Sequence, residues 1–109
     1  MNYRVSGIVV KGDGYGRKLG FPTVNLESRA VELPPVGVYS GTAVLDSTTY
    51  RAGIAMRPEG RIEAHLIGYN GNAYGHMVIL RIGKFLREYK KFEDEEELKK
   101  QIAEDLKQC

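Results

Sequence analysis

The chain has 109 residues, 42% of them hydrophobic and 28% charged, and a formal net charge of +2. This length suits a single domain over residues 1–109 with one core, and the nearly balanced charge excludes a broad basic surface for nucleic acid. Apolar runs fall short of the roughly 20 residues that span a bilayer, and the N-terminus lacks a signal peptide's apolar stretch, so we expect a cytoplasmic protein.

Most of the chain has the pattern of a strand-rich fold, because short β-rich runs alternate with turn signals. The runs that predict strands are 3–10, 37–45, 48–56, 62–67 and about 74–85. With the extended segment around residues 22–26 these make six, which favours a closed, Greek-key-like antiparallel barrel over an open sheet, because closure removes unpaired edges.

Three short polar segments predict the turns between these strands. Asp46-Ser47 is expected to close a hairpin between the second and third long runs. Residues 57–60 are expected to form the next turn. Asn70-Gly71-Asn72 is the clearest hairpin signal in the chain, and it predicts that the strands on either side of it pair with each other.

The C-terminal segment has the pattern of an amphipathic helix. Asp94 followed three residues later by Glu97 fits a capping box. Leu98, Ile102 and Leu106 form one apolar stripe, which we expect to pack inward against the barrel. The only cysteine, Cys109, cannot form an internal disulfide, and we expect an exposed thiol without a role.

A glycine-rich segment near the N-terminus is a candidate phosphate-binding loop. Gly12, Gly14 and Gly16 allow backbone N–H groups to approach phosphate oxygens, and Arg17 and Lys18 add positive charge. The alternative is a flexible turn, which is the commoner use of such glycines. The segment lacks the Gly-Lys-Ser/Thr of the Walker loop, and the chain after it favours an extended path rather than a Rossmann helix.

Thr23 and Asn25 are candidate metal ligands. They lie two residues apart on the extended segment, so both side chains are expected to point to the same face. Hard oxygen ligands suit Mg²⁺, which binds few protein groups and keeps substrate phosphates and water as its other ligands.

Glu63 is the best candidate for a general base. In the alternating run 62–67, Glu63, His65 and Ile67 are expected on one face and Ile62, Ala64 and Leu66 on the other. The alternative from the pattern alone is the polar outer face of an edge strand. For His65 we expect a structural part, such as orienting a loop, rather than a catalytic one.

Residues 16–26 as one segment resemble the signature of riboflavin kinases, in which Pro-Thr-x-Asn follows Gly-Arg-x-Leu-Gly. Residues 63–66 resemble the family's Glu-x-His-Leu/Ile, and Tyr74-Gly75 and residues 87–92 resemble segments that follow it. The resemblance runs from Gly7 to the final helix and is to the C-terminal kinase domain of bacterial bifunctional riboflavin kinase/FAD synthetases.

This resemblance implies Mg²⁺-dependent transfer of the ATP γ-phosphoryl group to the 5′-hydroxyl of riboflavin, giving FMN and ADP, with Glu63 as base. It implies a metal held by Thr23 and Asn25 and flavin contacts from Arg87, Lys90 and Phe92. The expected nucleotide-binding residues are Gly12, Gly14, Gly16, Arg17, Thr23, Leu66, Gly68 and Tyr74. We expect a monomer that binds neither nucleic acid nor membranes.

Two segments depart from the family pattern. Residues 53–60 are short and lack the family's Asn-x-Gly, and Glu88 stands where proline is common. One alternative is therefore a non-catalytic flavin-binding or flavin-sensing barrel, and another is a small barrel that binds protein or single-stranded nucleic acid. The chain has no room for the nucleotidyltransferase domain that often precedes the kinase domain, so if it is complete we expect it to stop at FMN.

Overall fold

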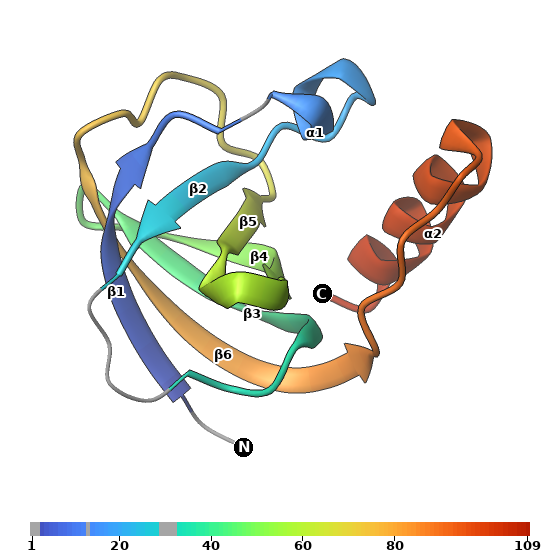
Figure 1. Ribbon diagram of the computed structural model, residues 1–109. Coiled ribbons are helices and arrows are strands. Elements are labelled where there is room, and N and C mark those ends of the chain that lie inside the picture. Colours follow the sequence, from blue (N-terminus) through green and yellow to red (C-terminus); the bar gives the residue numbers. More distant parts are fainter. Residues whose placement is uncertain (1–2, 13, 29–32) are drawn as a thin grey trace.

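The computed structural model describes residues 3–12, 14–28 and 33–109 (Figure 1). Its strands are β1 (Tyr3–Val10), β2 (Val24–Glu27), β3 (Gly37–Leu45), β4 (Thr48–Met56), β5 (Ile62–Leu66) and β6 (Met77–Arg87). Its helices are the four-residue α1 (Tyr15–Lys18), the 3₁₀ turn η1 (Pro58–Gly60) and α2 (Glu95–Lys107). Among the described residues, no helix is both long and apolar enough to cross a membrane.

The six strands close into the predicted antiparallel barrel, in the order β1-β2-β5-β4-β3-β6 (Figure 1). Strands β3, β4 and β5 follow one another as neighbours, and β6 returns to lie beside β3, which is the Greek-key arrangement. Side chains alternate between the packed interior and the outer surface. The largest side chains that are fully buried are Tyr39, Leu45, Ile54, Ile62, Leu80, Ile82, Val5 and Val78.

The strands predicted from local patterns have the expected bounds for β1, β3 and β4. The turn between β3 and β4 is also as predicted, because Asp46 and Ser47 both have positive φ angles of 50° and 67°. Two successive positive φ values are typical of the two-residue turn whose twist matches that of a hairpin.

The predicted hairpin at residues 70–72 is wrong. Strand β6 pairs with β1 and β3, whereas β5 pairs with β2 and β4, so residues 67–76 cross from one part of the barrel to another. Strand β6 also begins at Met77 rather than near Tyr74, because Gly75 adopts a φ of 81° and His76 N–H donates to the carbonyl of Ala73, forming a turn. It ends at Arg87 rather than at Phe85, and β5 ends at Leu66 rather than at Ile67.

Helix α2 begins at the predicted cap but does not use the predicted capping box. The Asp94 carboxylate accepts a hydrogen bond from the N–H of Glu96 at 2.9 Å, one residue earlier than the box requires. The stripe of Leu98, Ile102 and Leu106 does face the barrel, but these side chains are half-buried because they line a pocket.

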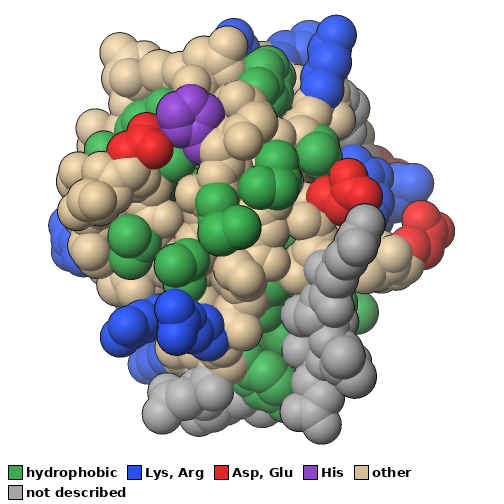
Figure 2. Space-filling view, turned by 90° about the vertical axis from the view of Figure 1, so that its left-hand side faces the viewer, with side chains coloured by type: hydrophobic (Ala, Val, Ile, Leu, Met, Phe, Trp, Pro, Cys, Tyr) green, Lys and Arg blue, Asp and Glu red, His purple; other side chains and the backbone are tan. Residues whose placement is uncertain are grey.

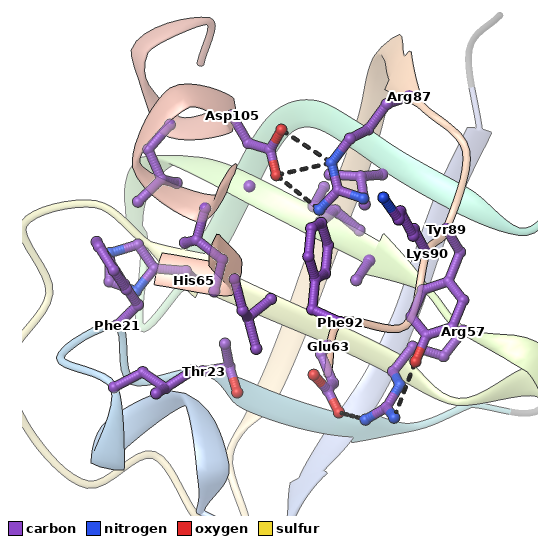
Figure 3. A pocket seen from close by; sticks show the side chains of 18 of the residues that line it. Phe21, Thr23, Arg57, Glu63, His65, Arg87, Tyr89, Lys90, Phe92 and Asp105 are labelled. Atoms are coloured by element: carbon purple, nitrogen blue, oxygen red, sulfur yellow. Dashed lines mark hydrogen bonds and ion pairs between the residues drawn. The ribbon is translucent and has the colours of Figure 1, made fainter. Parts of the chain in front are cut away.

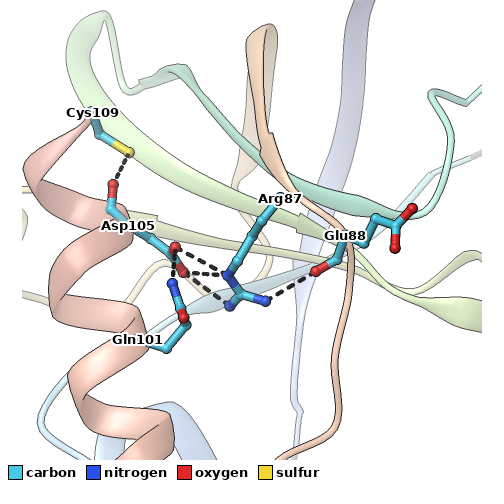
Figure 4. A network of polar contacts seen from close by, with 5 residues as sticks. All are labelled: Arg87, Glu88, Gln101, Asp105 and Cys109. Carbon is cyan, nitrogen blue, oxygen red and sulfur yellow. Dashed lines mark hydrogen bonds and ion pairs between the residues drawn. The ribbon is translucent and has the colours of Figure 1, made fainter.

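The last turn of α2 packs against β4. A Cβ on Gly53 of β4 would lie 2.9 Å from Cδ2 of Leu106, so the absence of a side chain at Gly53 admits the helix. Cys109 is half-buried there rather than exposed, which corrects the prediction. Its thiol donates to the carbonyl of Asp105 at 3.4 Å (Figure 4), and burial, followed by the nearby Asp105 charge, raises the pKa of Cys109.

The opposite side of the barrel carries scattered apolar side chains among polar ones (Figure 2). Ile8 of β1 and Met77 of β6 are cross-strand partners on the outer surface, 39% and 57% exposed. Neither residue lines the two pockets described below, which both lie elsewhere on the barrel.

Candidate active site

A pocket of about 340 Å³ lies between the outer surface of the barrel and α2 (Figure 3). Its barrel side comes from β4 and β5, the ends of β3 and β6, and the chain before β2. Its opposite wall is the apolar stripe of α2, and its end is formed by the β6–α2 connection, residues 88–94. The pocket therefore combines an apolar wall with a polar floor. The predicted site residues that it brings together are Thr23, Glu63, Arg87, Lys90 and Phe92.

Glu63 lies on the polar floor, and its side chain is 17% exposed. The predicted alternation of β5 is confirmed, because Ile62, Ala64 and Leu66 are buried in the barrel. Its Oε1 accepts a hydrogen bond from Nη1 of Arg57 at 2.7 Å, and Nη2 of Arg61 lies 3.7 Å from the same oxygen. The candidate base is thus a carboxylate held in position by arginine.

Arg57 is a site residue that sequence reasoning missed. The sequence predicts only a turn over residues 57–60. The turn does form, and a hydrogen bond from Arg57 N–H to the carbonyl of Arg61 closes it at 2.8 Å. Ala55 is the cross-strand partner of Glu63, and Arg57 follows Ala55 by two residues. Residues two apart point to the same face, so Arg57 lies diagonally from Glu63 on the outer face, and this spacing was the available signal.

Thr23 and Asn25 approach Glu63 through the β2–β5 pair. Asn25 is the direct cross-strand partner of Glu63, and Val24 is that of Ala64. Asn25 also lies against the glycine-rich segment, because a Cβ on Gly12 would clash with its side-chain amide. Thr23 lines the pocket, whereas Asn25 does not. The shared face expected for Thr23 and Asn25 stays a prediction, since the strand register includes Asn25 but not Thr23.

His65 holds the chain that leads into Thr23. Its Nδ1 lies 2.6 Å from the carbonyl oxygen of Pro22, and because a carbonyl only accepts, Nδ1 is the donor. The ring of Phe21 packs edge-on against the imidazole, with 6.0 Å between ring centroids. These contacts agree with the expected part of His65 in orienting a loop.

Arg87, Lys90 and Phe92 meet at the end of the pocket (Figure 3). The Phe92 ring lies 5.8 Å from the Arg87 guanidinium carbon and 5.1 Å from Lys90 Nζ, both within cation–π range. Its face is thus an electron-rich surface already in contact with cations.

The Arg87 guanidinium is tied to helix α2 (Figure 4). Its Nε and Nη2 donate to the carboxylate of Asp105, which is 5% exposed, at distances of 2.9 to 3.1 Å. Gln101 donates to the same carboxylate at 2.9 Å. Sequence reasoning missed Asp105; the signal was an acidic residue beside Leu106 on the inward stripe of a helix, a position that needs a cationic partner.

A second pocket, of about 510 Å³, lies on the other side of Thr23. It brings together four of the predicted nucleotide-binding residues, Arg17, Thr23, Leu66 and Tyr74. Among the residues that the structure describes, Thr23 alone lines both pockets. The other predicted nucleotide residues, Gly12, Gly14, Gly16 and Gly68, line neither pocket, and Gly16 belongs to the short helix α1, which was not predicted.

The described part of the chain contains no group of three or more histidine, cysteine or acidic side chains that could hold a metal ion. Thr23 and Asn25 supply hard oxygens beside Glu63, which is the kind of sparse set that Mg²⁺ uses when substrate phosphates complete its coordination.

Comparison with known proteins identifies relatives. The sequence matches the family model described as Flavokinase: Riboflavin kinase over residues 1–109. Two bifunctional riboflavin kinase/FMN adenylyltransferases are similar to it. That of Bacillus subtilis is 32% identical, and the match covers 98% of this chain and 37% of the relative's length. That of Escherichia coli K12 is 33% identical, and the match covers 94% of this chain and 36% of the relative's length. The chain thus spans little more than a third of the length of these relatives.

A solved structure is also similar to this chain. It is named as a macrolide-efflux protein from Streptococcus pneumoniae, with a TM-score of 0.87 and 28% identity over 95% of this chain and 37% of that one. The match again spans about a third of the other protein, so its name describes a longer molecule.

Proposed function

Because this chain belongs to the riboflavin kinase family, we propose that it transfers the γ-phosphoryl group of ATP to the 5′-hydroxyl of riboflavin, giving FMN and ADP. The observation that carries this proposal is that Thr23, directly before β2, lines both pockets, while Glu63 of β5 lines the first pocket and has Asn25 of β2 as its cross-strand partner. A transfer between two substrates needs such a meeting point.

The pocket beside α2 suits the flavin. An isoalloxazine ring is flat and aromatic with polar edges, and the pocket has an apolar wall from Leu98, Ile102 and Leu106 and an aromatic face from Phe92. Lys90 and backbone groups of the β6–α2 connection are available to its polar edge. The ribityl chain would then extend toward Glu63.

The second pocket suits ATP. Arg17 lies beside it at the end of α1 and supplies positive charge, while Tyr69 and Tyr74 offer aromatic surface for adenine. The γ-phosphate would point toward Thr23, where the second pocket meets the first.

The reaction follows from these positions. The ribityl oxygen forms a bond to the γ-phosphorus, its proton passes to the Glu63 carboxylate, and the bond from that phosphorus to the β–γ bridging oxygen breaks, releasing ADP. Such transfers have loose transition states in which positioning and charge neutralisation dominate. Proton acceptance by a placed carboxylate typically contributes a factor of about 10²–10⁴.

Thr23 and Asn25 would hold the divalent cation. Their side-chain oxygens and the adjoining Gly12 backbone fit an ion that shares its coordination with phosphates. When bound, the cation neutralises charge on the β- and γ-phosphates. We propose that this cation is Mg²⁺. We also propose that the protein acts in the cytoplasm, where ATP is available, as a monomer without nucleic acid or membrane partners.

The experiment that tests this function is incubation of the pure chain with riboflavin, ATP and Mg²⁺, followed by chromatography for FMN. FMN formation that stops with EDTA supports the proposal. Absence of FMN together with tight riboflavin binding, seen as fluorescence quenching, would contradict it and favour the non-catalytic flavin-binding barrel.

A further inference from the structure

Arg57 connects the candidate base to the end of the flavin pocket. Its Nη1 donates to Oε1 of Glu63 at 2.7 Å, and its Nη2 donates to the hydroxyl of Tyr89 at 3.2 Å (Figure 3). The guanidinium also lies 5.6 Å from the centre of the Tyr89 ring. One planar side chain thus links β5 with the β6–α2 connection.

Both arginine contacts of Glu63 go to the same carboxylate oxygen. The shortest contacts of Glu63 with Arg57 Nη1 and with Arg61 Nη2 are both made by Oε1, and within the described ranges Oε2 accepts no hydrogen bond. A carboxylate held through one oxygen keeps its orientation while the other oxygen remains able to accept a proton.

Arg57 is well suited to hold this position permanently. Its side chain is 26% exposed, so its contact with Glu63 is less screened than that of Arg61, which is 45% exposed and a full ångström farther away. Burial lowers the pKa of Arg57, but the hydrogen bonds and charges of Glu63 and Tyr89 outweigh it, so the net change is upward. The guanidinium stays charged throughout the pH range of the enzyme.

We infer that Arg57 is a positioning residue for the proposed reaction: it fixes Oε1 of Glu63 so that Oε2 faces the flavin hydroxyl, and through Tyr89 it couples this orientation to the β6–α2 connection. The inference rests on the proposed function, in which Glu63 accepts the proton. Arg57 acts through Glu63, so its contribution to turnover should exist only while Glu63 is a carboxylate.

The test is a double-mutant cycle on the full chain, with FMN formation measured under saturating ATP and Mg²⁺. The variants are Arg57→Met, Arg57→Lys, Glu63→Gln and the double variant Arg57→Met/Glu63→Gln. Arg61→Met is the matched control, because it removes the more distant arginine from the same oxygen. Thermal unfolding of each variant reports whether it folds.

We expect Arg57→Met to lower kcat by about 10- to 100-fold with little change in the KM for riboflavin, because misplacing a reacting group by about 1 Å has that effect. Arg57→Lys should recover part of the loss, and Arg61→Met should stay within about twofold of the parent chain. In the Glu63→Gln background the Arg57→Met change should have no further effect.

Three results would overturn the inference. An equal loss from Arg57→Met in both backgrounds would assign Arg57 a purely structural part. Unchanged or faster turnover in Arg57→Met would show that the ion pair does not assist the base. If the parent chain makes no FMN, the proposed function itself fails. This failure differs from a failure of the inference about Arg57, because it is seen in the parent chain before any variant is compared.

Discussion

Asn25 and Glu63 face each other directly across the β2–β5 pair. Directly opposed residues in an antiparallel pair have Cβ atoms only about 5 Å apart, so the proposed metal ligand and the proposed base are neighbours by strand register alone. Both of these proposed groups are thereby held on strands of a closed barrel rather than on a loop.

Glu63→Gln should fold normally and lose turnover. The amide keeps the shape of the side chain but cannot take up the hydroxyl proton, so we expect kcat to fall by about 10²–10⁴. FMN formation measures the loss, and riboflavin binding by fluorescence quenching serves as the control for an intact pocket. Turnover equal to that of the parent chain would remove Glu63 from the reaction.

Asn25→Ala should weaken the dependence on the cation. Loss of one of the two proposed protein oxygens should raise the Mg²⁺ concentration needed for half-maximal FMN formation by about tenfold or more. Thr49→Ala, at an exposed position of β4, is the control and should titrate like the parent chain. A superimposable Mg²⁺ titration for Asn25→Ala would contradict the assignment of this residue to the metal.

Asp105→Asn should destabilise the attachment of α2. The change leaves Arg87 beside a neutral side chain, and breaking a largely buried ion pair typically costs about 3–5 kcal/mol, less here because Arg87 is 21% exposed. Urea unfolding measures the change in the free energy of unfolding.

Glu104→Gln is the matched control on the same helix. The Glu104–Lys107 pair spans 3.7 Å, and its side chains are 62% and 75% exposed. Loss of this pair should change the free energy of unfolding by less than about 0.5 kcal/mol. Equal effects of both changes would mean that the buried pair adds nothing.

Cys109 should react slowly with alkylating reagents at neutral pH. Because burial and the Asp105 charge raise the pKa of the thiol, the folded chain holds less thiolate than an exposed cysteine would at the same pH.

The same shift makes the stability of the fold depend on pH, because the folded state binds the thiol proton more strongly than the unfolded state. The contribution of Cys109 to stability is complete below the unfolded-state pKa and is lost as pH rises through the folded-state pKa. Iodoacetamide rates in buffer and in urea across pH 7–10 measure this, and equal rates in both would contradict it.

The parts of the fold that local chemistry determines were predictable. The β3–β4 hairpin needed only Asp46-Ser47 and the two runs beside them, and the two faces of β5 followed from its alternation. Asn70-Gly71-Asn72 misled because pairing of β6 with β3 and β1 is decided by closure of the whole barrel, which overrides a local turn preference.

The candidate site divides in the same way. Thr23, Asn25 and Glu63 carry their signals in short spacings, which the resemblance to riboflavin kinases reinforced. The partners of the charged residues could not be read from spacing, because Arg57 meets Tyr89 and Arg87 meets Asp105 only after separate elements pack together. The assignment of Arg87 to the flavin edge stays a prediction, and its guanidinium binds Asp105 of the helix.

Thr23 is the single described residue that both pockets share. A molecule bound in either pocket therefore leaves nearly all the walls of the other in place. If the two pockets take the flavin and the nucleotide as proposed, neither substrate has to build the binding surface of the other, and the two can be expected to bind in either order.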